Sequence, residues 1–158
     1  MGLDFNADEI FEMAEQIERN GAVFYRTAAE KVSDASEKEF LLELARMEDE
    51  HEVTFAGLRK ELADKETGSM TFDPEEEAPL YLKALADTRV FFEKEINTSS
   101  MEAILKDAVV AEKDSIVFYL GMKDLVPAKL GKDKIDSIIK EEMSHIRLLS
   151  NKLVSLKK

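Results

Sequence analysis

The 158-residue chain contains no cysteine, no tryptophan and only two histidines, His51 and His145. The lack of cysteine excludes disulfides, thiolate zinc sites, iron–sulfur clusters and thiol nucleophiles from this sequence. Any metal bound here must therefore use oxygen and imidazole ligands. With 22 basic and 34 acidic residues, the chain has a net charge of −12. This charge argues against a nucleic-acid or anionic-membrane partner, because both carry charge of the same sign.

Long apolar runs are also absent. No stretch approaches the roughly 20 apolar residues of a membrane-spanning helix, and residues 1–9 are acidic without the apolar segment of a signal peptide. We therefore expect a cytoplasmic protein. A chain of this length can bury enough apolar surface for one core, so we expect a single domain over residues 1–158.

Glycine and proline, which interrupt helices, are scarce, with six and three copies. All three prolines fall outside the long stretches with helical apolar periodicity, so the predicted fold class is all-α. Two capping boxes, Asn6 with Glu9 and Ser99 with Glu102, predict where two helices start. The pattern predicts long helices over residues 6–32, 37–64 and 99–125, a fourth from after Gly131 to about 157, and a shorter helix over 80–96 within a crossover at 65–98.

The sequence contains an internal repeat, in which residues 23–25 (Val-Phe-Tyr) recur as residues 117–119 at an offset of 94. The long helices therefore form two equivalent pairs, over residues 6–64 and 99–157. In each half, a glutamate on the first helix is followed 30 residues later by Glu-x-x-His on the second. The offset relates Glu18 to Glu112, Glu48 to Glu142 and His51 to His145.

These polar residues interrupt apolar helix faces. On the 37–64 helix, Glu48 and His51 share a face with leucines and a phenylalanine, and the 99–157 half repeats this arrangement. An unpaired buried carboxylate is strongly unfavourable, so four that converge on one core need a compensating positive charge. Two divalent cations would supply that charge.

The predicted ligands of these cations are Glu18, Glu48, His51, Glu112, Glu142 and His145. Residues three apart on a helix are neighbours, so each Glu-x-x-His pair can reach one small volume. The two Glu-x-x-His glutamates would bridge the ions, the other two would be terminal ligands, and each histidine would supply one nitrogen. Such a ligand set suits iron or manganese and can accept zinc. The alternative is a pair of buried histidines that contact nearby acids without metal.

Tyr25 and Tyr119 each lie seven positions, or two helical turns, after Glu18 and Glu112. Their hydroxyls could donate hydrogen bonds to metal-bound carboxylates and so orient them. The alternative is that both are ordinary core aromatics.

At these residues the sequence resembles the ferritin-like di-iron carboxylate class and, within it, the di-iron domain of rubrerythrins. The resemblance rests on the two Glu-x-x-His pairs and on Tyr25 and Tyr119 following their glutamates, and it covers essentially the whole chain. It implies a four-helix bundle with one long crossover and two bound iron ions. It also implies a homodimer that reduces hydrogen peroxide, or reacts with dioxygen, in oxidative-stress defence. No catalytic residue is predicted beyond the metal ligands.

The sequence departs from typical rubrerythrins in two respects. It lacks their cysteine-ligated rubredoxin domain, so electrons would come from an external donor such as a rubredoxin. It also has Ser115 where rubrerythrins carry a further glutamate, with Gly21 in the repeat-related position. The alternatives to an oxidoreductase are a ferroxidase or iron-handling protein without catalytic turnover, and a structural metal-binding bundle.

Overall fold

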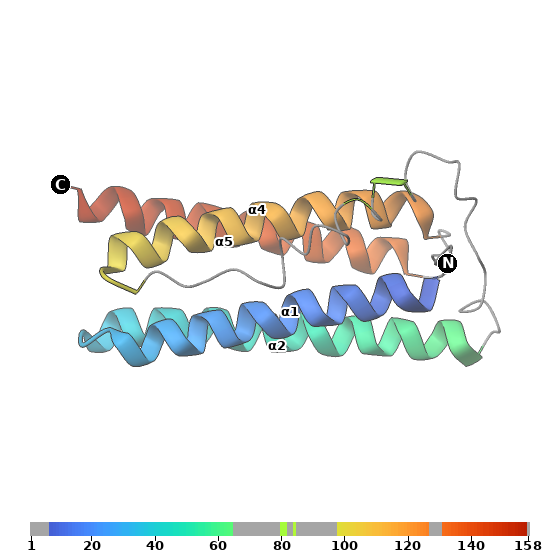
Figure 1. The fold of residues 1–158 in the computed structure, drawn as a ribbon, viewed down its shortest axis with the longest axis horizontal. Helices are drawn as coiled ribbons and strands as arrows, with labels where there is room; N and C mark the ends of the chain where they lie inside the picture. Colours follow the sequence, from blue (N-terminus) through green and yellow to red (C-terminus); the bar gives the residue numbers. More distant parts are fainter. Residues whose placement is uncertain (1–6, 65–79, 82–83, 85–97, 127–130, 158) are drawn as a thin grey trace.

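Four long α-helices make up nearly all of the described structure (Figure 1). The computed structural model describes residues 7–64, 80–81, 84, 98–126 and 131–157. No strand occurs within these ranges, which confirms the predicted all-α class. The helices are α1 (Ala7–Lys31), α2 (Ala35–Asp64), α4 (Met101–Leu125) and α5 (Lys132–Leu156).

The helices form a bundle of two close pairs, α1 with α2 and α4 with α5 (Figure 1). Helix α2 ends at one end of the bundle, whereas α4 begins at the other. The chain therefore leaves α2 and enters α4 at opposite ends of the bundle, as the predicted crossover at 65–98 requires. Most of the predicted short helix at 80–96 lies outside the described residues, although Leu80 and Tyr81 are helical.

Two helices begin at different residues from those predicted. Helix α2 begins at Ala35 rather than Glu37, because the Asp34 carboxylate already accepts a hydrogen bond from the Glu37 amide at 2.9 Å. Helix α4 is capped by Ser100, not Ser99: the extended Ser100 accepts from the Ala103 amide at 3.1 Å. The predicted cap Asn6 lies outside the described residues.

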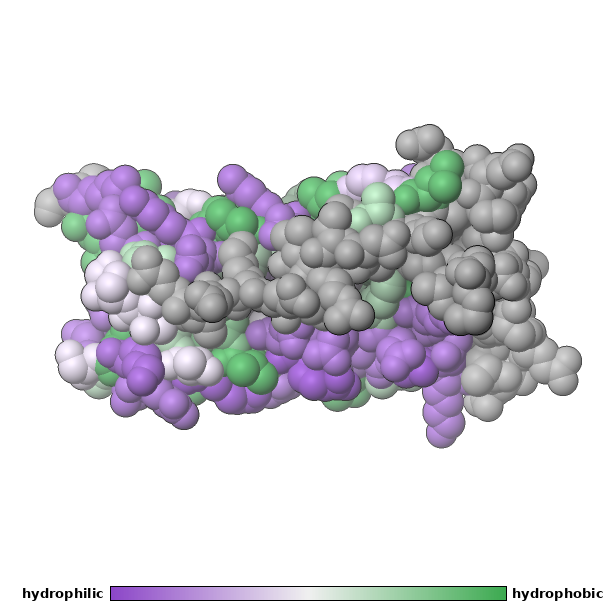
Figure 2. Space-filling model, viewed as in Figure 1, coloured by the Kyte–Doolittle hydropathy of each residue, from purple (hydrophilic) through white to green (hydrophobic). Residues whose placement is uncertain are grey.

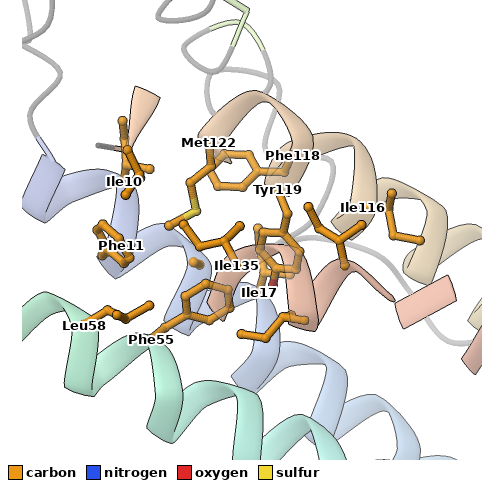
Figure 3. Packing of buried hydrophobic residues seen from close by; sticks show 14 residues of the cluster. Ile10, Phe11, Ile17, Phe55, Leu58, Ile116, Phe118, Tyr119, Met122 and Ile135 are labelled. Carbon is orange, nitrogen blue, oxygen red and sulfur yellow. The ribbon is translucent and has the colours of Figure 1, made fainter. Parts of the chain in front are cut away.

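Two apolar clusters fill the bundle interior. The first cluster includes Phe11, Phe55, Tyr119 and Ile135 (Figure 3), and the second includes Tyr25, Leu44, Leu105 and Leu149. Along each of the four helices, the predicted ligands stand in sequence between residues of the two clusters. The polar centre is therefore enclosed by apolar packing along the bundle axis.

On the face shown in Figure 2, hydrophilic residues predominate over the α1–α2 pair. Ion pairs join these two helices, including Arg19 with Glu52 at 2.7 Å and Arg26 with Asp49. Arg59 on α2 also binds the Asp8 carboxylate at 2.7 Å. Within the described parts of the chain, none of the helices has the length and apolarity needed to cross a membrane.

Candidate metal centre

The six predicted ligands come together in the middle of the bundle. Every one of them is buried, with at most 4% of its surface exposed. Helices α1 and α4 each contribute one glutamate, and α2 and α5 each contribute a Glu-x-x-His pair. The residues are Glu18, Glu48, His51, Glu112, Glu142 and His145.

The ligand atoms of these residues form two overlapping sets. Position A consists of Glu18, Glu48, His51 and Glu142, and position B consists of Glu48, Glu112, Glu142 and His145. Within each set, the ligand atoms all lie within 4.8 Å of one another. Glu48 and Glu142 belong to both sets, which is the arrangement expected of carboxylates that bridge two ions. Each half of the repeat adds one further glutamate and one histidine to its own position.

Several buried ligand atoms have no hydrogen-bond partner within the described structure. Each of the four glutamates has one such oxygen, and His145 has both ring nitrogens in this state. Buried polar atoms are almost always paired, so a concentration of unpaired acceptors in one volume is unusual. Carboxylate oxygens and imidazole nitrogens that converge in this way fit a pair of divalent cations such as iron.

Protonation balances part of the charge in the metal-free centre. Burial raises the pKa of Glu142 to about 7, and the nearby charge of Glu48 adds to the effect. Burial also raises the pKa of Glu48 well above its usual value, with a further contribution from Glu18. Burial alone would lower the pKa of His51, but the hydrogen bond with Glu142 and the nearby Glu18 carboxylate together raise it to about 12. Binding of cations would therefore displace protons from these groups.

Both histidines direct Nδ1 towards the carboxylates. His51 Nδ1 lies 2.9 Å from Glu142 Oε1 and 3.5 Å from Glu18 Oε2. His145 Nδ1 lies 3.5 Å from an oxygen of Glu48 and 3.5 Å from an oxygen of Glu112. The same nitrogen of each ring is thus placed to bind an ion.

Tyr25 and Tyr119 make hydrogen bonds that cross between the halves of the repeat. Tyr25 donates to Glu112 Oε1 at 2.6 Å, and Tyr119 donates to Glu18 Oε1 at 2.7 Å. Burial, followed by the nearby carboxylate charges, raises the pKa of both tyrosines well above the usual value, so both hydroxyls keep their protons. In each glutamate, the oxygen that the tyrosine does not bind is one of the unpaired atoms. Each tyrosine therefore fixes one oxygen of its glutamate, and the other oxygen has no hydrogen-bond partner among the described residues.

Comparison with known proteins identifies the family and the fold of the chain. The sequence matches the Rubrerythrin family over residues 9–153. The chain belongs to the rubrerythrin family. A protein of Thermotoga maritima, described as a ferritin-like diiron-carboxylate protein, has a similar fold with a TM-score of 0.69 over 95% of each chain at 24% identity. No curated protein sequence matches this rubrerythrin-family chain.

Gly21 allows the Glu48 carboxylate of this rubrerythrin-family protein to lie close to α1. A Cβ atom at Gly21 would stand 3.2 Å from Glu48 Oε2, which is closer than nine in ten such contacts. The repeat-related Ser115 donates its hydroxyl to the Ala111 carbonyl on the preceding turn, at 3.0 Å. Neither residue supplies the further carboxylate that typical rubrerythrins have after the α4 ligand.

Glu141 is a residue of this centre that sequence analysis missed. Its carboxylate contacts His51 Nε2, the ring nitrogen that faces away from the other ligands. The Glu141 side chain is 53% exposed, so it lies off the apolar face that identified the ligands. The repeat gave no signal for it either, because Met47 occupies the related position.

Proposed function

We propose that this rubrerythrin-family protein is a non-haem di-iron oxidoreductase that reduces hydrogen peroxide or dioxygen. The observation that carries the proposal is the pair of overlapping ligand sets, which share Glu48 and Glu142. Two ions bound side by side suit a two-electron oxidant, which a single ferrous ion would reduce only by half.

Two ferrous ions in positions A and B would supply one electron each and act as a Lewis acid towards the oxidant. Glu48 and Glu142 would set the spacing of the ions, because each lies in both ligand sets. Tyr25 and Tyr119 would hold the terminal carboxylates in position through their hydrogen bonds. The apolar clusters on both sides would limit access of water along the bundle.

Repeated turnover needs an electron donor. The 158 residues contain no cysteine and therefore no iron–sulfur group, so we propose a separate donor such as a rubredoxin. The family resemblance supports a cytoplasmic homodimer that acts in oxidative-stress defence.

The test is to load the metal-free protein with ferrous iron under anaerobic conditions and mix it with hydrogen peroxide or dioxygen in a stopped-flow instrument. We expect rapid oxidation of two irons by each molecule of peroxide. Glu142→Gln should slow this reaction at least tenfold, because it replaces a shared carboxylate with a neutral amide. Glu50→Gln is the matched control, since Glu50 lies on α2 with its side chain 59% exposed. A slow reaction that Glu142→Gln leaves unchanged would contradict the proposal.

Iron handling without catalytic turnover is a second candidate, which the lack of cysteine in these 158 residues favours. Such a protein would oxidise its bound iron once and then store or deliver it. Addition of reduced rubredoxin and excess peroxide distinguishes the two functions: continuous consumption of peroxide supports the oxidoreductase, and a single burst supports iron handling.

A further inference from the structure

The two histidines of the centre differ in what holds their outer ring nitrogen. His51 Nε2 contacts the Glu141 carboxylate, whereas His145 Nε2 has no hydrogen-bond partner among the described residues. The sequence encodes this difference, because the repeat places Met47 where the other half has Glu141. A methionine thioether is only a weak acceptor and carries no charge.

This contact affects how well an imidazole binds a metal ion. When Nδ1 binds an ion, Nε2 carries the proton and donates it to any partner within reach. A carboxylate partner fixes the tautomer and orientation of the ring and makes it a more basic ligand. His51 in position A has such a partner in Glu141, and His145 in position B does not.

We propose that the two metal positions are unequal, and that position A binds its ion more tightly because Glu141 orients His51. Glu141 is then a positioning residue that acts through His51. The inference rests on the proposed metal centre and adds an order of occupancy: position A fills first, and position B loses its ion first. Loss of a carboxylate partner of this kind weakens metal binding by about 10- to 100-fold, and we expect a difference of that size between the positions.

Two unequal binding steps in the unaltered protein would not be sufficient evidence, because ions that share Glu48 and Glu142 repel one another. The test therefore uses variants that each keep one histidine. His145→Ala retains the whole ligand set of position A, and His51→Ala retains that of position B. Cobalt(II) is the probe, and its affinity is measured by visible absorption in competition with a chelator. We expect His145→Ala to bind one cobalt ion about 10- to 100-fold more tightly than His51→Ala.

Glu141→Met, which copies the other half of the repeat, is then added to each variant. In the His145→Ala background, this change should weaken cobalt binding at least tenfold and shift the cobalt spectrum. In the His51→Ala background, it should have little effect on cobalt affinity, because the imidazole partner of Glu141 is absent there. Glu141→Gln keeps an acceptor without the charge and should restore part of the affinity. Met47→Glu in the His51→Ala background should strengthen cobalt binding at position B.

Because the Glu141 side chain is about half exposed, its replacement should not disturb the fold, and circular dichroism checks this directly. Equal cobalt affinities in the two single-histidine variants would overturn the inference. An equal effect of Glu141→Met in both backgrounds would overturn it as well, because Glu141 would then act by its charge alone. Failure of the unaltered protein to bind cobalt is a different result, which would overturn the proposed metal centre together with this inference.

Discussion

The terminal glutamates of the centre illustrate how single residues determine its geometry. Glu18 and Glu112 each have one oxygen bound by a tyrosine of the opposite repeat half and one oxygen without a partner. A carboxylate that is fixed in this way can offer a single oxygen to an ion without rotating. The same hydrogen bonds connect α1 to α4, the two helices that carry these glutamates.

Replacement of Tyr119 by phenylalanine tests this role. Tyr119→Phe removes the hydrogen bond to Glu18 but keeps the buried ring, so we expect affinity at position A to fall about tenfold. Tyr25→Phe should have the corresponding effect at position B through Glu112. Cobalt titration of each variant in the His145→Ala and His51→Ala backgrounds measures the effects separately. Equal losses at both positions from either variant would show that the tyrosines act on the bundle as a whole.

Gly21 gives a second prediction at the residue scale. Gly21→Ala places a methyl group 3.2 Å from Glu48 Oε2, so it should displace a carboxylate that both positions share and weaken binding of both ions. Gly57→Ala is the matched control: it lies in the same type of helix, and a Cβ there meets nothing within 4 Å. We expect the control to raise the free energy of unfolding by about 1 kcal/mol, the usual gain for this change within a helix. Unchanged cobalt affinity in Gly21→Ala would contradict the expected displacement.

Sequence patterns pointed to the six candidate ligands because two independent patterns coincide on them. The helical period places each residue on an apolar face, and the repeat requires each one to have a counterpart. The crossed tyrosine bonds could not be predicted, because a spacing of seven residues shows that Tyr25 and Glu18 share a face but says nothing about the facing helix. Glu141 was missed since a side chain that is half exposed leaves no trace in apolar periodicity.

At the scale of elements, the residue at which each helix begins depends on local hydrogen bonds, which sequence patterns predict only approximately. Both Ser99 and Ser100 could cap α4 on sequence grounds, and Glu102 favours Ser99 through the capping-box spacing. The structure uses Ser100, whose hydroxyl reaches the Ala103 amide three residues later. The helices themselves were predictable, because each one buries a mainly apolar face and lacks an internal proline. The crossover carries a weaker pattern, and most of it lies outside the described residues.

Ser100→Ala tests which residue caps α4. Loss of the side-chain acceptor leaves an amide of the first turn unpaired and should lower the free energy of unfolding by about 1 kcal/mol. Urea denaturation of the metal-free protein measures the change. Ser100→Asp serves as the matched variant, because a carboxylate can accept the same hydrogen bond, and it should keep most of the stability. If Ser100→Ala proved as stable as the unaltered protein, the Ala103 amide would have to be satisfied in another way.

For the whole molecule, a fold built around four buried carboxylates should depend on what neutralises them. In the absence of metal, protons take this role, because burial raises the pKa of Glu18, Glu48 and Glu142. A carboxyl group with a raised pKa contributes its full stability below its usual pKa and loses that contribution as the pH rises through the folded value. The surface acid Asp8 has a lowered pKa and acts in the opposite direction, but below its usual value of 3.8.

We therefore expect the metal-free protein to become less stable as the pH rises from 5 to 8. For Glu142, whose pKa rises from 4.5 to about 7, the loss is about 3 kcal/mol. The pKa of His51, which is raised from 6.5 to about 12, has an effect of the same sign, but most of its contribution is lost only above this pH range.

Urea denaturation at pH 5, 6, 7 and 8 in the presence of a chelator measures the trend, and the same series with excess cobalt(II) is the comparison. Because the ions replace the protons, cobalt should stabilise the protein most at pH 8 and least at pH 5. A metal-free protein that gained stability between pH 5 and 8 would mean that these carboxylates are ionised and balanced by another group.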